Sequence, residues 1–117
     1  MKVMTFHVID NPSHKAHAGF KAHQFRMLDA LYLQGVSRKT LAHRTVECDF
    51  DAGTASYTYY KSHESQPFLQ FIIRKVGPHT VHFELYKTQK GRIAKSGLFE
   101  RTYNKLVSEL ESLTDSA

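Results

Sequence analysis

The sequence predicts an α+β fold, a two-layer sandwich in which two helices cover one face of a mostly antiparallel sheet of five or six strands. Three observations lead to this prediction. Apolar residues recur with helical spacing in two segments, and apolar and polar residues alternate with a period of two in most of the segments between them. Turn-forming residues, chiefly glycine, proline and aspartate, separate these segments. The expected order of elements is β-α-β-β-β-β-β-α.

The first strand is expected at residues 3–9, which are apolar on both faces apart from Thr5 and His7 and therefore suit the interior of a sheet. The next element is a helix from about Gly19 to Gln34, with Gly35 ending it in a left-handed conformation. Its apolar side consists of Phe20, Phe25, Met27, Leu28, Leu31 and Tyr32.

Five further strands are expected at residues 41–50, 55–61, 68–76, 80–87 and 92–96. Turns separate them, among them Gly77-Pro78. A closing helix follows, and its apolar residues recur at spacings of three and four: Phe99, Tyr103, Leu106, Leu110 and Leu113. The chain has 117 residues and no linker, so residues 1–117 are expected to form one α+β domain.

Two helices on one face leave the other face of the sheet open to solvent or to a partner. Candidates for the open face are the residues that alternate with the expected core: Tyr57, Tyr59 or Tyr60, Gln70, Arg74, His82, Glu84 and Tyr86.

The formal net charge of +5 is distributed unevenly along the chain. Residues 1–46 contain seven Lys or Arg against two acids, and residues 61–101 contain eight against three. Glu47, Asp49 and Asp51 form an acidic cluster between them. If folding brings the basic segments onto one face, the potential there exceeds what the net charge indicates.

The most informative segment is KTQKGRIAK, residues 87–95, which contains four cations and no acid around Gly91. We expect it to be the tip of a hairpin that joins the last two strands. With one more lysine and three tyrosines from a neighbouring strand, its cations are the predicted partner-binding residues: Lys87, Lys90, Arg92, Lys95, Tyr57, Tyr59, Tyr60 and Lys61.

Two classes of partner fit these residues. In a complex with single-stranded nucleic acid, the cations would neutralise phosphates and the rings would stack on bases, at ~1–3 kcal/mol per base. In a complex with a protein, the basic hairpin and the open face would meet an acidic surface, where Tyr and Arg are common hot-spot residues. Because no nucleic-acid-binding consensus occurs in any strand, the sequence favours a small regulatory or inhibitory protein-interaction module, with nucleic-acid binding as the alternative. Homodimerisation through a sheet face or edge is also expected.

The sequence favours catalysis less than binding. The elements His43-Arg44-Thr45-Val46 and His63-Glu64-Ser65-Gln66 resemble the H-x-[ST]-x elements of two-histidine phosphoesterases. The resemblance implies a metal-independent phosphodiesterase in which one histidine acts as base and the other as acid. The second element departs from the pattern because no apolar residue follows Ser65.

Neither a metal nor a cofactor is expected. The eight histidines show no zinc-binding motif, and the six glycines are scattered singly, without phosphate-loop spacing. The single cysteine, Cys48, lies between Glu47 and Asp49, whose negative charge disfavours a thiolate. We expect Cys48 to be a small buried residue. Without a recognisable secretory signal or membrane span, a cytoplasmic location and no membrane partner are expected.

Overall fold

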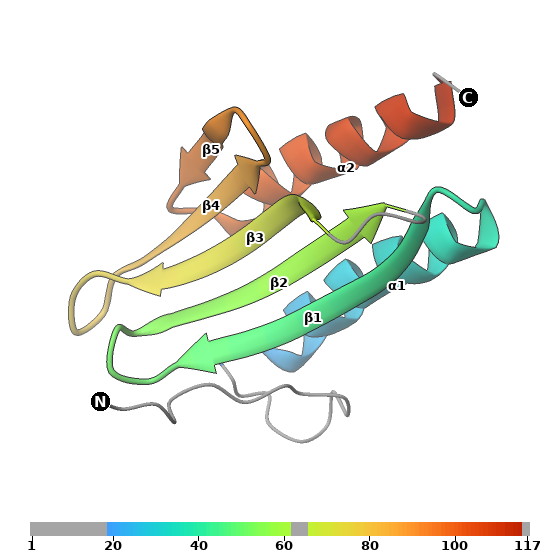
Figure 1. Cartoon of the computed structure of the whole chain (residues 1–117). Helices are drawn as coiled ribbons and strands as arrows, with labels where there is room; N and C mark the ends of the chain where they lie inside the picture. Colours follow the sequence, from blue (N-terminus) through green and yellow to red (C-terminus); the bar gives the residue numbers. More distant parts are fainter. Residues whose placement is uncertain (1–18, 62–65, 116–117) are drawn as a thin grey trace.

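The computed structural model describes residues 19–61 and 66–115. They form one antiparallel sheet of five strands, in which each strand pairs with the next along the chain, and two helices on the same face of that sheet (Figure 1). The elements are α1 (Ala22–Ser37), β1 (Leu41–Asp49), β2 (Thr54–Lys61), β3 (Pro67–Lys75), β4 (Val81–Lys87), β5 (Gly91–Ser96) and α2 (Phe99–Asp115). The predicted α+β class is confirmed. The strand predicted at residues 3–9 lies outside the described residues.

The strand register places a row of large side chains beneath the helices. Val46 pairs with Tyr57, Tyr57 with Phe71, and Phe71 with Leu85, so the row crosses four strands. All four side chains are fully buried, and each burial contributes roughly 1.5–3 kcal/mol. The helices contribute further buried residues to this core, among them Phe25, Leu28, Phe99 and Leu106.

Aromatic contacts fix α2 against the sheet. The ring centroid of Phe99 lies 5.4 Å from that of Phe71 and 5.7 Å from that of Phe83. The hydroxyl of Thr102 donates a hydrogen bond of 3.0 Å to the carbonyl oxygen of Phe83. Helix α1 packs against β1, and α2 packs against β4 and β5, so the two helices cover opposite halves of one sheet face (Figure 1).

Glycines allow two of the hairpin turns. In the β1–β2 turn, the Asp49 side chain accepts hydrogen bonds from the backbone of Asp51 and Ala52, both at 3.1 Å, and Gly53 has a φ of +68°. In the β4–β5 turn, Gly91 has a φ of +78°. Residues with a Cβ atom rarely adopt this left-handed backbone conformation, which explains why glycine occupies both positions.

The end of α1 differs from the prediction. The helix continues through Gly35 to Ser37, and Lys39 is the residue with a left-handed backbone, with a φ of 65°. Gly35 is required for another reason, because a Cβ atom there would lie 2.4 Å from Cδ1 of Leu41. The missing side chain therefore lets the start of β1 pack directly against the helix. Strand β3 begins at Pro67, one residue before the predicted start, at a position where a missing N–H is tolerated.

Candidate binding site

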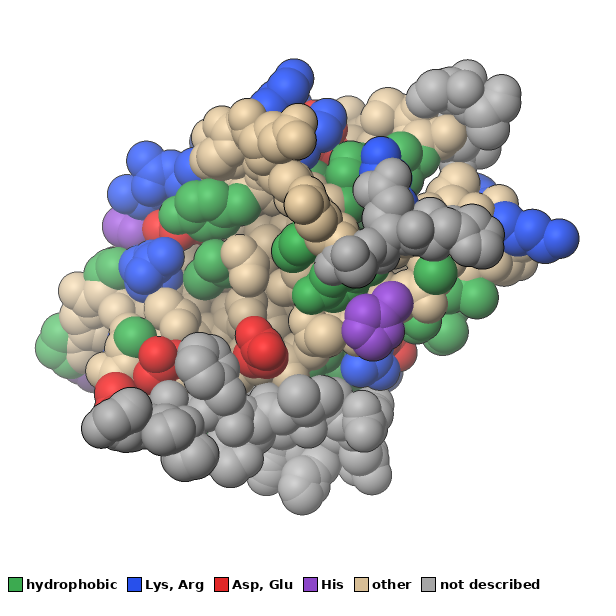
Figure 2. Space-filling view, viewed as in Figure 1, with side chains coloured by type: hydrophobic (Ala, Val, Ile, Leu, Met, Phe, Trp, Pro, Cys, Tyr) green, Lys and Arg blue, Asp and Glu red, His purple; other side chains and the backbone are tan. Residues whose placement is uncertain are grey.

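In the described part of the chain, no helix lies on the sheet face opposite α1 and α2, which we call the helix-free face. The register assigns it His43, Thr45, Glu47, Ser56, Thr58, Tyr60, Gln70, Ile72, Arg74, His82, Glu84, Tyr86, Arg92 and Lys95. Figure 2 views this face: Lys and Arg side chains gather towards β4 and β5, whereas Asp and Glu side chains lie mainly along β1 and its turn. The face is therefore electrostatically divided.

The helix-free face carries a charge cluster around Glu84, which is only 2% exposed. Arg74 donates from Nε to both carboxylate oxygens, at 3.3 and 3.2 Å, and from Nη2 at 3.2 Å. The hydroxyl of Tyr86 donates at 2.8 Å. A second guanidinium group, from Arg92, lies 3.9 Å from the carboxylate. The Arg74 and Arg92 side chains remain 38% and 48% exposed, so both guanidinium groups reach the surface.

The electrostatics of this cluster favour the ionised carboxylate. Burial alone would raise the pKa of Glu84, but the hydrogen bonds from Arg74 and Tyr86 outweigh it and hold that pKa below its ordinary value. The same hydrogen bonding raises the pKa of Arg74. Two arginines share one negative charge, so the cluster keeps a net positive charge near neutral pH.

The predicted exposure of Tyr57 and Tyr59 is wrong, since both side chains are fully buried beneath α1. The strand register places them there, and both hydroxyl groups find acceptors: that of Tyr57 donates to Asp29 at 2.5 Å, and that of Tyr59 donates to the carbonyl oxygen of Leu28 at 2.7 Å. Buried rings cannot stack on a base. Of the three predicted tyrosines, only Tyr60 is on the helix-free face, and it is half-buried.

The basic segment forms the β4–β5 hairpin, as predicted, but its four cations do not share one surface. Lys87 turns towards α2, where its Nζ lies 2.9 Å from Oε1 of Glu109. Arg92 and Lys95 lie on the helix-free face, and Lys90 is exposed in the turn. The Lys87 hydrogen bond lowers the pKa of the Glu109 carboxyl group.

Lys61, Lys87 and Lys90 meet instead in a groove of about 380 Å³ at one end of the sheet. We call it the lysine groove; its other walls include Pro67, Phe68 and Thr88. The ammonium groups of Lys61 and Lys87 lie 5.0 and 5.8 Å from the centroid of the Phe68 ring. Sequence reasoning named the three lysines but could not bring them together, because the register of three strands is needed to do so.

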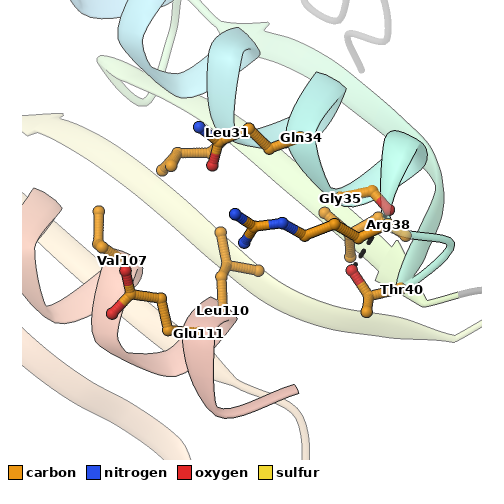
Figure 3. Close-up of a pocket in the computed structure, with 9 residues that line it drawn as sticks. Leu31, Gln34, Gly35, Arg38, Thr40, Val107, Leu110 and Glu111 are labelled. Carbon is orange, nitrogen blue, oxygen red and sulfur yellow. Dashed lines mark hydrogen bonds between the residues drawn. The ribbon is translucent and has the colours of Figure 1, made fainter. Parts of the chain in front are cut away.

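Described residues also line cavities elsewhere in the fold. A small one of about 30 Å³ separates the C-terminal parts of α1 and α2, and Figure 3 shows the Arg38 side chain pointing across it towards Leu110. Another, of about 320 Å³, has an apolar wall that includes Cys48 and Ile73. Cys48 itself is buried, as predicted.

The predicted catalytic pair cannot be assembled from the described residues, because His63 lies outside them. His43 lies on the helix-free face, with its ring centroid 5.0 Å from that of Tyr60. Residues 19–61 and 66–115 contain no group of three His, Cys, Asp or Glu side chains that could hold a metal ion. Neither described helix is long and apolar enough to cross a membrane.

The chain matches no protein-family model, and no curated protein or solved structure is significantly similar to it. The functional argument therefore depends on the geometry of these surfaces.

Proposed function

We propose that this chain is a non-catalytic binding domain, a small regulatory or inhibitory module that contacts an acidic surface of a partner protein through its helix-free face. The observation that carries the proposal is the pair of guanidinium groups, Arg74 and Arg92, arranged around the buried carboxylate of Glu84. Lys95, the cross-strand neighbour of Glu84 on β5, adds a third exposed cation.

The chemistry of this cluster suits a partner that carries carboxylates. The planar guanidinium group forms paired hydrogen bonds with a carboxylate, which a lysine cannot do. Glu84 holds Arg74 through three hydrogen bonds, so this side chain loses less conformational freedom when a partner binds. Tyr86 pairs with Arg92 across the strands and shares the Glu84 carboxylate with Arg74. Tyr and Arg are the residue types that most often dominate binding energy at interfaces.

Single-stranded nucleic acid is the second candidate partner. It is favoured by Tyr60 and Tyr86, whose rings share the helix-free face with the cations. It is disfavoured by the burial of Tyr57 and Tyr59, since two of the three rings expected to stack on bases are inaccessible.

The test for the protein partner compares two double variants that remove the same charge. Arg92→Ala/Lys95→Ala changes the helix-free face, whereas Arg26→Ala/Arg101→Ala changes exposed residues on the two helices. A partner isolated by quantitative affinity purification should have an acidic surface. Calorimetry with that purified partner should show that the first variant binds at least about tenfold more weakly, a loss of ~1.4 kcal/mol in binding free energy. Equal affinities of the two variants for that partner would overturn the proposal.

The nucleic-acid candidate is tested by fluorescence anisotropy with a thymidine oligonucleotide. If several phosphates are contacted, affinity should fall steeply between about 50 and 200 mM salt. No binding at the lowest salt concentration would remove this candidate. Homodimerisation stays a prediction, for which sedimentation velocity is the direct test.

A further inference from the structure

We propose that the lysine groove is a second binding site, separate from the helix-free face, for a small phosphorylated molecule that carries at least two negative charges. Three lysines from two parts of the chain line it: Lys61 at the end of β2, and Lys87 and Lys90 from the β4–β5 hairpin. The proposal does not depend on the proposed protein partner, whose contact residues lie on another surface.

Local charge supports an anionic ligand. Glu109 lies 2.9 Å from the groove lysine Lys87. Glu109 is also 3.4 Å from Lys105, so two cations already share this one carboxylate. One carboxylate cannot neutralise both Lys87 and Lys105, and an anion bound among the three groove lysines would lower the repulsion between their ammonium groups.

Phe68 restricts which part of a ligand can be recognised. Its side chain is only 8% exposed, and the ammonium groups of Lys61 and Lys87 lie near its ring. Cation–π contacts of this kind help to position the two ammonium groups. Because the ring is covered, it offers no free face on which a nucleobase could stack. The ligand is thus recognised through its phosphates.

The size and remaining polar groups of the groove agree with this class. About 380 Å³ lies in the usual range for small-ligand sites and is ample for two or three linked phosphates. The exposed side chains of Gln66 and Gln89 at its rim offer amide N–H donors. The Thr88 hydroxyl already donates to the carbonyl oxygen of Pro67, so it ties the turn to the start of β3.

Isothermal titration calorimetry with inorganic pyrophosphate and tripolyphosphate tests the proposal. The titrations are made at about 0.15 M salt, where charges more than ~8 Å apart are largely screened. We expect saturable binding to one site, with tripolyphosphate bound more tightly than pyrophosphate. The absence of saturable binding by the folded protein would overturn the proposal.

Lys90→Ala and Lys95→Ala form a matched pair, because both change an exposed lysine of the same hairpin and only Lys90 lines the groove. Lys90→Ala should weaken pyrophosphate binding by about tenfold and Lys95→Ala by less than about twofold. Equal weakening by both variants would show attraction to net charge alone and would overturn the proposal. The Arg92→Ala/Lys95→Ala variant should still bind pyrophosphate, whether or not a protein partner for the helix-free face is found.

Discussion

Tyr57 and Tyr59 show how a tyrosine on the buried face of a strand satisfies its hydroxyl group. Both rings are buried among apolar residues, and both hydroxyl groups reach oxygen acceptors on α1, namely Asp29 and the carbonyl of Leu28. Asp29 in turn forms an ion pair with Arg44, at 3.2 Å. Burial, followed by the hydrogen bond to Asp29, raises the pKa of Tyr57, and burial also raises that of Tyr59. The folded state therefore disfavours both phenolates.

Replacing Tyr57 with Phe should lower the free energy of unfolding by about 1 kcal/mol, because Asp29 loses one donor but keeps Arg44. A folded-state pKa above the unfolded value of about 10 gives a stability that is complete below pH 10 and is lost as pH rises. Tyr57→Phe should thus also reduce the alkaline loss of stability. Urea denaturation across pH measures both effects. The control is Tyr60→Phe, which should change stability by less than ~0.5 kcal/mol; an equal effect in both would contradict the role of the Tyr57 hydroxyl group.

Glu84→Gln should lower stability by about 1–3 kcal/mol at neutral pH, because charge-assisted hydrogen bonds from Arg74 and Tyr86 are lost. The pKa of Glu84 is lowered by folding, so its contribution is present above the unfolded value of about 4.3 and is lost as pH falls through the lower folded value. The variant should therefore lose less stability in acid than the wild type. Glu47→Gln on the same face is the control. Identical acid profiles for Glu84→Gln and the wild type would contradict this account.

At the level of the elements, the contact between α1 and β1 depends on the absence of a side chain. Gly35 lies inside the helix, where glycine is normally unfavourable by about 1 kcal/mol relative to alanine. Its buried position against Leu41 outweighs that preference. The backbone of Thr40 donates to the carbonyl oxygen of Gly35 at 2.9 Å and its hydroxyl donates to the same atom at 3.3 Å, so the connection is tightly closed (Figure 3).

Gly35→Ala should destabilise the protein by about 1–3 kcal/mol, in spite of the better helix propensity of alanine, because the new methyl group would overlap the Leu41 side chain. Gly97→Ala is the control, since nothing lies within 4 Å of the added Cβ atom. Thermal or denaturant unfolding of both variants is the measurement. A stabilised Gly35→Ala variant would mean that Leu41 moves aside without cost.

At the level of the whole molecule, each of the five described strands pairs with its neighbour in the chain, so this part of the sheet consists of successive antiparallel pairs. Both helices close over one continuous core on one side of that sheet. Cys48 belongs to this core and is 3% exposed. Its thiol is therefore a reporter of how the core opens.

Labelling of Cys48 by a thiol reagent should be at least about a hundredfold slower in the native protein than in the unfolded chain, because a buried thiol reacts only after opening. The labelling rate, followed by absorbance over a denaturant series, should rise together with global unfolding measured by circular dichroism. Rapid labelling of the native protein would instead show that the sheet opens locally around β1.

For strand β2, the sequence predicted the strand itself but not which of its two faces is buried. Its alternation indicated two faces, but tyrosines occur on both and were expected to face outward. Ser56 and Thr58 alternate with Tyr57 and Tyr59, so the polar hydroxyl residues already indicated which face was the outer one. The alternation with Ser56 and Thr58 thus indicated that Tyr57 and Tyr59 face inward. The tyrosines were nevertheless expected on the outer face, because tyrosine is amphipathic; its ring packs as an apolar group wherever its hydroxyl group finds an acceptor.

By itself, the sequence determined the type and order of the described elements and the position of the basic hairpin, because hydrophobic period and turn chemistry are properties of neighbouring residues. Only the tertiary structure decided which cations share a surface. Lys87 and Arg92 are close in the chain, yet they belong to different surfaces because one contacts α2 and the other contacts Glu84. Lys61 and Lys87 are distant in the chain, yet they meet at Phe68, since strand register and helix packing bring together residues that no local pattern connects.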